Sequence, residues 1–253
     1  GPDVPRSCQL PADRYDVADP FYEPYDRDEI AYGDVPSSLV AAFAEQNGVT
    51  GSALDLGAGA GRDTIALAKA GFHVKAVDLS QRGLDRVMQR AAKSRVSDRV
   101  EIKCCDVREL KILPGTFDAV VATTVLDHIP MSDATKLWRK IAAAVTEEGF
   151  LFVEVHTTED PGCDRVVGQF ADAPVSETAD AVINYFEPNQ LLRMACEPES
   201  NLRVLSYEER QEWDYTHGPE HLHGKAILLA VRRGRYPQWF GQPAAFPRRV
   251  GST

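Results

Sequence analysis

Short apolar runs alternate with amphipathic segments through most of the chain. The apolar runs, typical of buried parallel strands, occupy residues 53–56, 72–77, 100–104, 117–123 and 150–155. The amphipathic segments predict helices over residues 39–46, 64–70, 80–94 and from Ser132 to Gly149. A short helix over 188–195 precedes two long strands, at 202–215 and 225–232, joined by a loop over 217–224. The alternation predicts an α/β fold with a parallel sheet and helices on both faces.

The pattern lapses in three places, which sets the domain organisation. Residues 1–36 form an arm rich in Pro, Asp and Tyr, residues 156–187 form an insertion with a short helix over 177–185, and residues 233–253 form a Pro-rich tail. The aromatic residues of the arm either pack it against the domain or form a lid over a ligand site, and the sequence supports both interpretations equally. Residues 37–232 are the predicted α/β domain.

A glycine loop follows the first predicted strand. Gly57, Gly59 and Gly61 alternate with alanines between that strand and the helix that begins near Thr64. Glycines at this spacing suit a tight turn whose backbone approaches a ligand closely, and the start of the helix favours negative charge. A dinucleotide site needs a small third residue, and Arg62 is too large for that position.

The pattern Asp-x-Gly-x-Gly-x-Gly, beginning at Asp55, resembles motif I of the class I S-adenosylmethionine (SAM) methyltransferases. Asp78 lies where that family keeps its ribose-binding acid. Cys105-Asp106-Val107 resembles the adenine-binding segment, and residues 117–130 and 149–153 resemble the fourth and fifth strands with the loop beside the transferred methyl group.

The resemblance implies a seven-stranded Rossmann-like sheet, mostly parallel with an antiparallel C-terminal strand. The cofactor is then SAM and the product S-adenosylhomocysteine. The implied cofactor-binding residues are Asp55, Gly57, Ala58, Gly59, Gly61, Arg62, Asp78, Leu79, Asp106, Val107 and Thr123. Residues 61–63, 185–192 and 221–224 more narrowly resemble the tellurite-resistance-type branch, whose members act on metalloid oxyanions, thiols and other small nucleophiles.

Composition and charge narrow the range of possible binding partners and cellular locations. The 253 residues carry a net charge of −10, which disfavours a nucleic-acid partner and favours a neutral or cationic small-molecule acceptor. No apolar run is long enough to span a membrane, and no signal peptide is visible. The five cysteines contain no C-x-x-C pair, which indicates a reducing, cytoplasmic location rather than a disulfide framework or a zinc site. The oligomeric state stays open.

Methyl transfer requires a positioned nucleophile and, for some acceptors, a base. Histidines at predicted strand ends are the candidates for the base, and His128, His221 and His223 are the predicted catalytic residues. The predicted substrate or lid residues are Tyr15, Tyr22, Tyr25 and His156. No metal site is predicted, because no carboxylate or cysteine stands at a recognised spacing from the histidines. The alternatives are a metalloid oxyanion methyltransferase and a SAM-binding module without catalysis.

Overall fold

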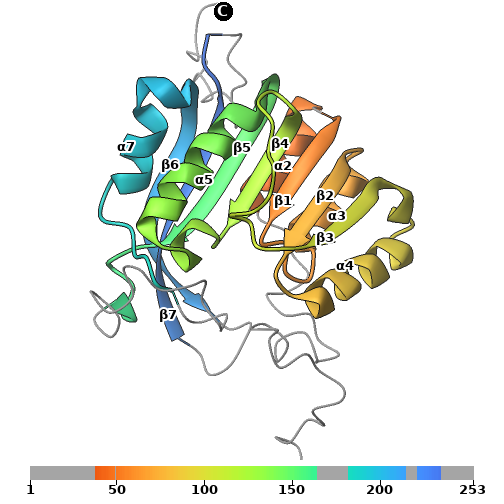
Figure 1. Cartoon of the computed structure of the whole chain (residues 1–253), viewed down its shortest axis with the longest axis horizontal. Coiled ribbons are helices and arrows are strands. Elements are labelled where there is room, and N and C mark those ends of the chain that lie inside the picture. Colours follow the sequence, from red (N-terminus) through yellow and green to blue (C-terminus); the bar gives the residue numbers. More distant parts are fainter. Residues whose placement is uncertain (1–37, 49, 164–181, 215–220, 235–253) are drawn as a thin grey trace, which may run out of the picture.

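The computed structural model describes residues 38–48, 50–163, 182–214 and 221–234 (Figure 1). The predicted arm with Tyr15, Tyr22 and Tyr25, most of the predicted insertion, and nearly all of the tail lie outside these residues. The lid and tail assignments therefore stay predictions.

Seven strands form one sheet, as the resemblance implied (Figure 1). They are β1 (Ser52–Leu56), β2 (His73–Asp78), β3 (Val100–Cys104), β4 (Phe117–Thr123), β5 (Val145–His156), β6 (Leu202–Asp214) and β7 (His221–Arg232). Their order across the sheet is β3-β2-β1-β4-β5-β7-β6. Strand β7 runs antiparallel to both of its neighbours, whereas the pairs from β3 to β5 are parallel. The predicted fold class is confirmed.

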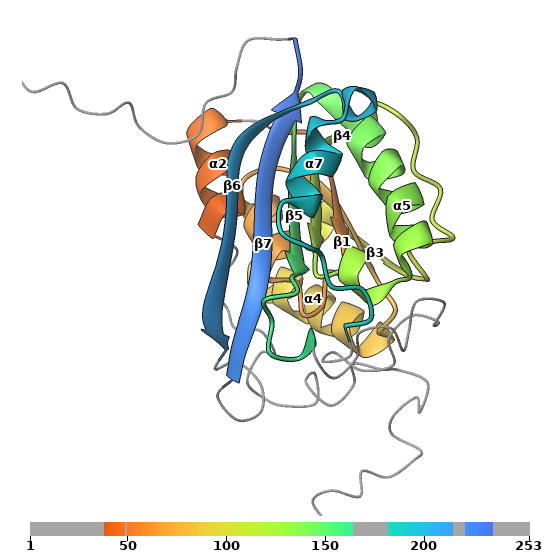
Figure 2. The same cartoon turned by 90° about the vertical axis from the view of Figure 1, so that its left-hand side faces the viewer.

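Helices cover both faces of the sheet, as Figure 2 shows for α2 on one side and α5 and α7 on the other. The helices are α2 (Ser38–Asn47), α3 (Arg62–Lys69), α4 (Gln81–Lys93), α5 (Met131–Ala144) and α7 (Gln190–Cys196). Short 3-10 turns lie at Ser97–Arg99, Leu126–His128 and Pro198–Ser200. None of the described helices is long and apolar enough to cross a membrane.

Alternate residues of the strands point to opposite faces of the sheet and contribute to two apolar layers. Leu54, Val120 and Leu151 pack in the layer under α5 and α7, whereas Val121 and Phe150 pack in the layer under α2, α3 and α4. The two-residue side-chain period of a strand therefore buries both faces, which explains why these strands are continuous apolar runs.

Two predicted element boundaries are wrong: the start of helix α5 and the start of strand β5. The helix begins at Met131 because the carbonyl of Pro130 already accepts the N–H of Ala134 (2.9 Å), so Ser132 lies inside the first turn and is not its cap. Strand β5 begins at Val145, with Gly149 inside it. A Cβ at Gly149 would lie 2.8 Å from the carbonyl oxygen of Asp118, so this glycine permits close strand contact and does not end the helix.

The final strand also begins earlier than predicted. Strand β7 begins at His221, which pairs with Asp214 of β6, so the predicted 217–224 loop is shorter and both His221 and His223 are strand residues. Of the predicted 177–185 helix, residues 177–181 lie outside the described chain and the remainder is not helical. Ile183 and Asn184 instead donate their N–H groups to the carbonyl oxygen of Asp127 (3.0 and 3.1 Å).

Candidate functional site

The described candidate residues meet at one edge of the sheet. Strands β1, β2, β4, β5 and β6 end there, and antiparallel β7 begins there with His221. The glycine loop follows β1, and the histidines follow β4 or lie on β5 and β7. Because β4, β5 and β7 stand one, two and three strands from β1, their histidines lie about 5, 10 and 14 Å from it across the sheet. In open α/β sheets this edge is where ligands bind.

The glycine loop adopts backbone angles that few other residues reach. Gly57, Gly59 and Gly61 have φ values of 67°, 56° and 89°. The N–H groups of Gly57 and Ala58 both donate to the carbonyl of Val77 (2.8 and 3.1 Å), which ties the loop to β2. The loop therefore presents backbone rather than side chains at the start of α3.

Asp78 is buried at the end of β2 and is oriented by backbone groups. Its Oδ2 accepts the N–H of Gly59 and its Oδ1 accepts the N–H of Ser80, each at 2.9 Å. Ser80 also caps α4 by accepting the N–H of Gly83 (3.0 Å), as its position in the sequence predicted. A carboxylate fixed in this way, beside a glycine loop, has the geometry to accept the two hydroxyls of a ribose.

Three carboxylates are buried around the loop, on Asp55, Asp63 and Asp78. The hydroxyl of Thr64 donates to Asp55 Oδ2 (2.6 Å). Burial, with Asp63 and Asp78 nearby, raises the pKa of Asp55 to about 8. The Arg62 guanidinium lies 4.0 Å from the carboxylate of Asp63. With a pKa of about 8, Asp55 is mostly protonated at neutral pH, so it adds little negative charge beside the loop.

The carboxylate of Asp106, just after the third strand, is already paired with Arg108. Arg108 binds Asp106 through Nε (3.1 and 3.0 Å) and NH2 (2.6 Å), and also reaches Asp133 (3.2 Å). Burial alone would raise the pKa of Asp106, but the bonds from Arg108 outweigh it and lower the pKa. The sequence did not single out Arg108, although it stands two residues after the predicted adenine acid.

The other predicted cofactor residues surround this part of the edge. Val107 is buried in the core, and the carbonyl of the half-buried Leu79 accepts the thiol of Cys104 (3.3 Å). The Oγ1 of Thr123, at the end of β4, is buried and has no hydrogen-bond partner among the described residues. A buried hydroxyl without a partner is costly, so this atom is suited to a ligand group.

A fully buried carboxylate links two of the predicted histidines. Asp127 Oδ1 lies 3.1 Å from Nδ1 of His128, and Oδ2 lies 2.6 Å from Nδ1 of His156. Asp127 Oδ2 also accepts the backbone N–H of His156 (2.8 Å). Burial alone would raise the pKa of Asp127, but both histidines stabilise its charged form and hold the pKa below its usual range. Both imidazoles are therefore oriented by one carboxylate that the sequence analysis missed, although it stands beside His128.

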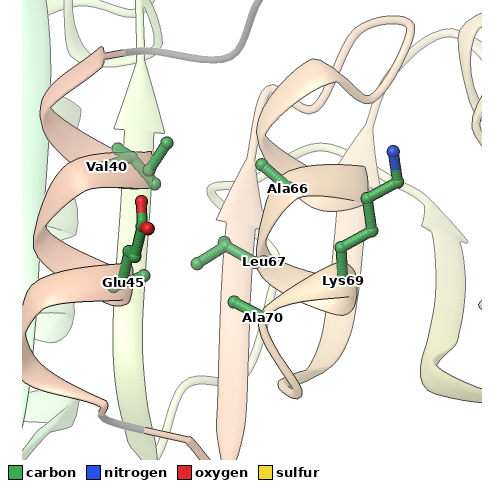
Figure 3. Close-up of a pocket in the computed structure, with 8 residues that line it drawn as sticks. Val40, Glu45, Ala66, Leu67, Lys69 and Ala70 are labelled. Atoms are coloured by element: carbon green, nitrogen blue, oxygen red, sulfur yellow. The ribbon is translucent and has the colours of Figure 1, made fainter.

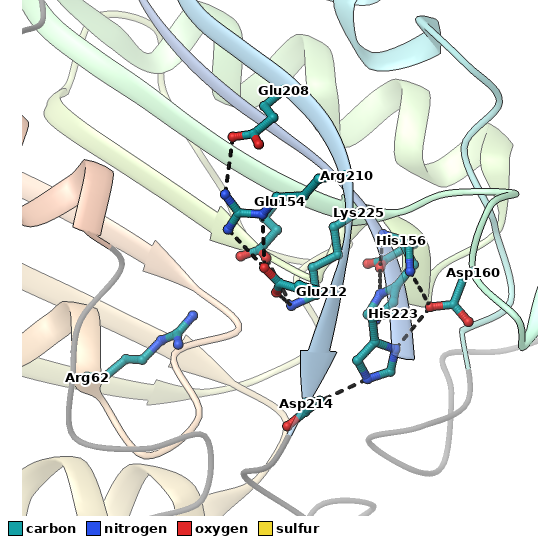
Figure 4. A network of polar contacts seen from close by, with 12 residues as sticks. Arg62, Glu154, His156, Asp160, Glu208, Arg210, Glu212, Asp214, His223 and Lys225 are labelled. Carbon is teal, nitrogen blue, oxygen red and sulfur yellow. Dashed lines mark hydrogen bonds and ion pairs between the residues drawn. The ribbon is translucent and has the colours of Figure 1, made fainter. Parts of the chain in front are cut away.

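His223 on β7 continues this cluster (Figure 4). His223 Nδ1 lies 3.0 Å from Asp160 Oδ2, and His223 Nε2 lies 3.3 Å from Asp214 Oδ2. The ring centroid of His223 lies 4.8 Å from that of His156 and 4.5 Å from that of His221. Burial alone would lower the pKa of His223, but Asp160 and Asp214 raise it to about 9. Asp160 and Asp214 come from separate elements, so spacing along the sequence could not pair them with His223.

An ion-pair ladder borders this cluster on the same face of the sheet (Figure 4). Lys225 Nζ lies 3.0 Å from Glu154 and 2.9 Å from Glu212, and Arg210 pairs with Glu212 (2.8 Å) and Glu208 (3.1 Å). These pairs neutralise Glu154, which is buried on β5 next to His156.

A separate pocket lies between α2 and α3 (Figure 3). Its volume is about 250 Å³, and its lining residues are Val40, Ala41, Ala44, Glu45, Ala66, Leu67, Lys69 and Ala70. None of the predicted site residues is among them, so the pocket is not part of the candidate site.

Comparison with known proteins places the chain among methyltransferases. Residues 53–149 match the model of a methyltransferase domain. The chain is 31% identical over 208 residues to 27-O-demethylrifamycin SV methyltransferase of Amycolatopsis mediterranei, covering 76% of this chain and 72% of that protein. It is 26% identical over 156 residues to ubiquinone biosynthesis O-methyltransferase of Chromobacterium violaceum, covering 60% of this chain and 66% of that protein.

Solved structures share the fold. TehB from Haemophilus influenzae superposes with a TM-score of 0.55 at 16% identity, over 72% of this chain and 57% of that one. The 1,6-didemethyltoxoflavin-N1-methyltransferase of Burkholderia thailandensis, solved with its acceptor and S-adenosylhomocysteine, superposes with a TM-score of 0.55 at 20% identity over 78% of both chains. At these identities the likeness is one of fold, so the TehB match does not favour a metalloid acceptor.

Proposed function

Since the chain belongs to the SAM-dependent methyltransferases, we propose that it transfers the methyl group of SAM to a hydroxyl oxygen of a small molecule. The observation that carries this proposal is the pairing of His128 with the buried Asp127 at the end of β4. A hydroxyl, unlike a neutral amine, is a poor nucleophile until its proton is removed, and an imidazole oriented by a carboxylate is suited to remove it.

The chain's own residues fit SAM, which supplies a methyl group on an electrophilic sulfonium. The glycine loop would hold the amino-acid part of the cofactor, and Asp78 would accept the ribose hydroxyls. Asp106 remains the proposed partner of the adenine amino group, oriented by Arg108. Thr123 Oγ1 would donate to or accept from the ligand close to β4.

His128 is the proposed general base. Its Nδ1 lies against Asp127 Oδ1, so Nε2 is the nitrogen that would take the acceptor's proton. Asp127 stabilises the imidazolium that forms, because it stays ionised. His156, held by the same carboxylate on the next strand, would line the acceptor side.

The relatives support oxygen as the acceptor atom. Both curated relatives described above are named as O-methyltransferases or for a 27-O position. The solved toxoflavin enzyme is named for nitrogen, but at 20% identity it shares only the fold. The acidic balance of the chain supports a neutral or cationic acceptor over a polyanion.

The test of the base measures S-adenosylhomocysteine formation by His128→Gln. We expect kcat to fall by about 10²–10⁴-fold, the usual contribution of a general base, while SAM affinity stays within about twofold. His73→Gln, at an exposed histidine on β2, is the matched control and should change neither quantity. Unchanged turnover by His128→Gln would reject His128 as the base and leave the methyltransferase assignment intact.

The acceptor atom is tested with matched compounds. Phenols and aliphatic alcohols are compared with the amines and thiols of the same carbon skeletons, using S-adenosylhomocysteine release as the readout. Faster turnover of the amines or thiols would overturn the hydroxyl proposal.

A further inference from the structure

Three side chains near the end of β5, two imidazoles and one carboxylate, are of the kinds that commonly bind a transition metal. His156, Asp160 and His223 each offer one ligand atom, and these atoms all lie within 4.8 Å of one another. Figure 4 shows the three side chains turned toward a common point, from the end of β5, the segment after it, and β7. Two imidazoles and one carboxylate form a donor set that suits zinc, iron and neighbouring divalent ions.

We propose that His156, Asp160 and His223 bind one divalent transition-metal ion, with Zn²⁺ as the reference ion. His223 Nδ1 and Asp160 Oδ2 are 3.0 Å apart. Two ligands that each lie about 2.1 Å from one ion are about 3.0–3.4 Å apart in octahedral or tetrahedral geometry. One edge of the coordination polyhedron is therefore already formed.

Both imidazoles are held by further carboxylates, as metal-binding histidines usually are. His156 lies against Asp127 through Nδ1 (2.6 Å), which directs Nε2 to the ion. His223 lies against Asp214 through Nε2 (3.3 Å), which directs Nδ1 to the ion. Such outer partners fix the ring orientation and typically change metal affinity by about 10–100-fold.

The carboxylate ligand is fixed by the backbone. Asp160 Oδ1 accepts the N–H of Gly162 (2.7 Å), and Oδ2 accepts the N–H of Gly224 (3.0 Å). A Cβ at Gly224 would clash with the backbone nitrogen of Asp160, so only glycine allows this segment to lie against β7. The local backbone is thus shaped to place Asp160 on His223.

A second group of possible metal ligands also contains His223 and is the alternative to the proposed ligand set. Asp214, His221 and His223 also offer ligand atoms within 4.8 Å of one another, but all three are half-buried. His156 and Asp160 are buried, and hydrogen bonds hold the imidazole of His156 and the carboxylate of Asp160. The more buried group, with oriented ligands, is therefore the proposed site. Three protein ligands leave at least one coordination position open toward an oxygen ligand.

The test uses the full chain without an affinity tag, freed of metal by a chelator. Titration with Zn²⁺ by calorimetry and with Co²⁺ by visible absorption should give one ion per chain with micromolar or tighter affinity, and Mg²⁺ should not compete. His156→Gln and Asp160→Asn should each weaken Zn²⁺ binding by at least 100-fold. The control His73→Gln should leave it within about twofold, and circular dichroism verifies that each variant is folded.

His221→Gln distinguishes the two groups. It should leave Zn²⁺ affinity within about threefold, whereas a large loss in His221→Gln together with no loss in His156→Gln would overturn the proposed ligand set. Absence of stoichiometric Zn²⁺ or Co²⁺ binding by the folded wild-type chain would overturn the site itself. Because metal affinity is measured without SAM or acceptor, neither result depends on the proposed methyl transfer.

Discussion

The two ends of the sheet edge that carries the candidate site are built by different means. At β1 and β2, backbone N–H groups and three glycines with positive φ shape the site, and the carboxylate of Asp78 accepts the N–H groups of Gly59 and Ser80. At β5 and β7, side chains between positions 127 and 223 face one another, and charged groups are buried in pairs. The glycine end depends on local backbone conformation, whereas the histidine end depends on long-range contacts between charges.

Because of this difference, substitutions at the two ends should have different effects on ligand binding and on stability. A side chain added at Gly59 would occupy the proposed space of the ligand, whereas one added at Gly57 or Gly61 would also clash with the core residues Val125 and Val87. A side chain removed from the histidine end leaves other buried polar groups without partners, which destabilises the fold itself. Variants at the first end should therefore lose binding, and variants at the second end should lose stability as well.

The largest expected effect on binding comes from Gly59→Val. Gly59 has a φ of 56°, which a β-branched residue reaches only with strain, and the added side chain would occupy the space of the cofactor. We expect no measurable SAM binding by calorimetry. Gly115→Val is the matched control, because Gly115 has a φ of 63° and its Cβ would meet nothing within 4 Å. Equal SAM affinity in both variants would show that the glycine loop is only a turn.

At the other end, Asp127→Ala should destabilise the fold. Its carboxylate carries two imidazoles and the backbone N–H of His156, and its removal leaves these groups buried without that partner. We expect the free energy of unfolding to fall by about 3–5 kcal/mol in urea titrations. Asp133→Ala, which breaks a part-exposed pair with Arg108, should cost at most about 1 kcal/mol. Similar losses in the two variants would contradict the contrast between buried and exposed charge.

The sequence predicted the glycine end because its information is contiguous. Strand, loop, helix and acid follow one another from residue 53 to Asp78, so period and spacing sufficed. The number of strands and the antiparallel C-terminal strand came from family resemblance, because pairing between distant strands leaves no local signal. Asp160 and Asp214 were missed as site residues because only the fold brings them to His223, and Asp127 was missed because its bond to His156 joins residues that are distant in the sequence. The start of β7 was missed because His221 and His223 are polar residues of a half-buried strand end.

A pH series on Asp55 tests the buried acid of the glycine end. Burial raises its pKa to about 8, whereas an aspartate in the unfolded chain titrates near 4. Between these values the folded chain holds a proton that the unfolded chain has released, so the free energy of unfolding falls as pH rises from about 4 to about 8. We expect Asp55→Asn to reduce this fall by on the order of 2–4 kcal/mol, measured by urea titrations at pH 5 and pH 8. Parallel pH curves for wild type and variant would show that Asp55 titrates normally.

The smallest expected effect is that of Asp78→Ala on SAM affinity. The carboxylate is already oriented by Gly59 and Ser80, so the proposed bonds to the ribose form without reorganisation. Losing hydrogen bonds to a charged group should weaken binding by roughly 1.5–3 kcal/mol, or about 10–150-fold in Kd. Asp85→Ala removes an exposed carboxylate from α4 and controls for the change in net charge. If calorimetry gave the same Kd for both variants, Asp78 would not bind the ribose. The affinity for SAM at the glycine end would then come from the glycine loop alone.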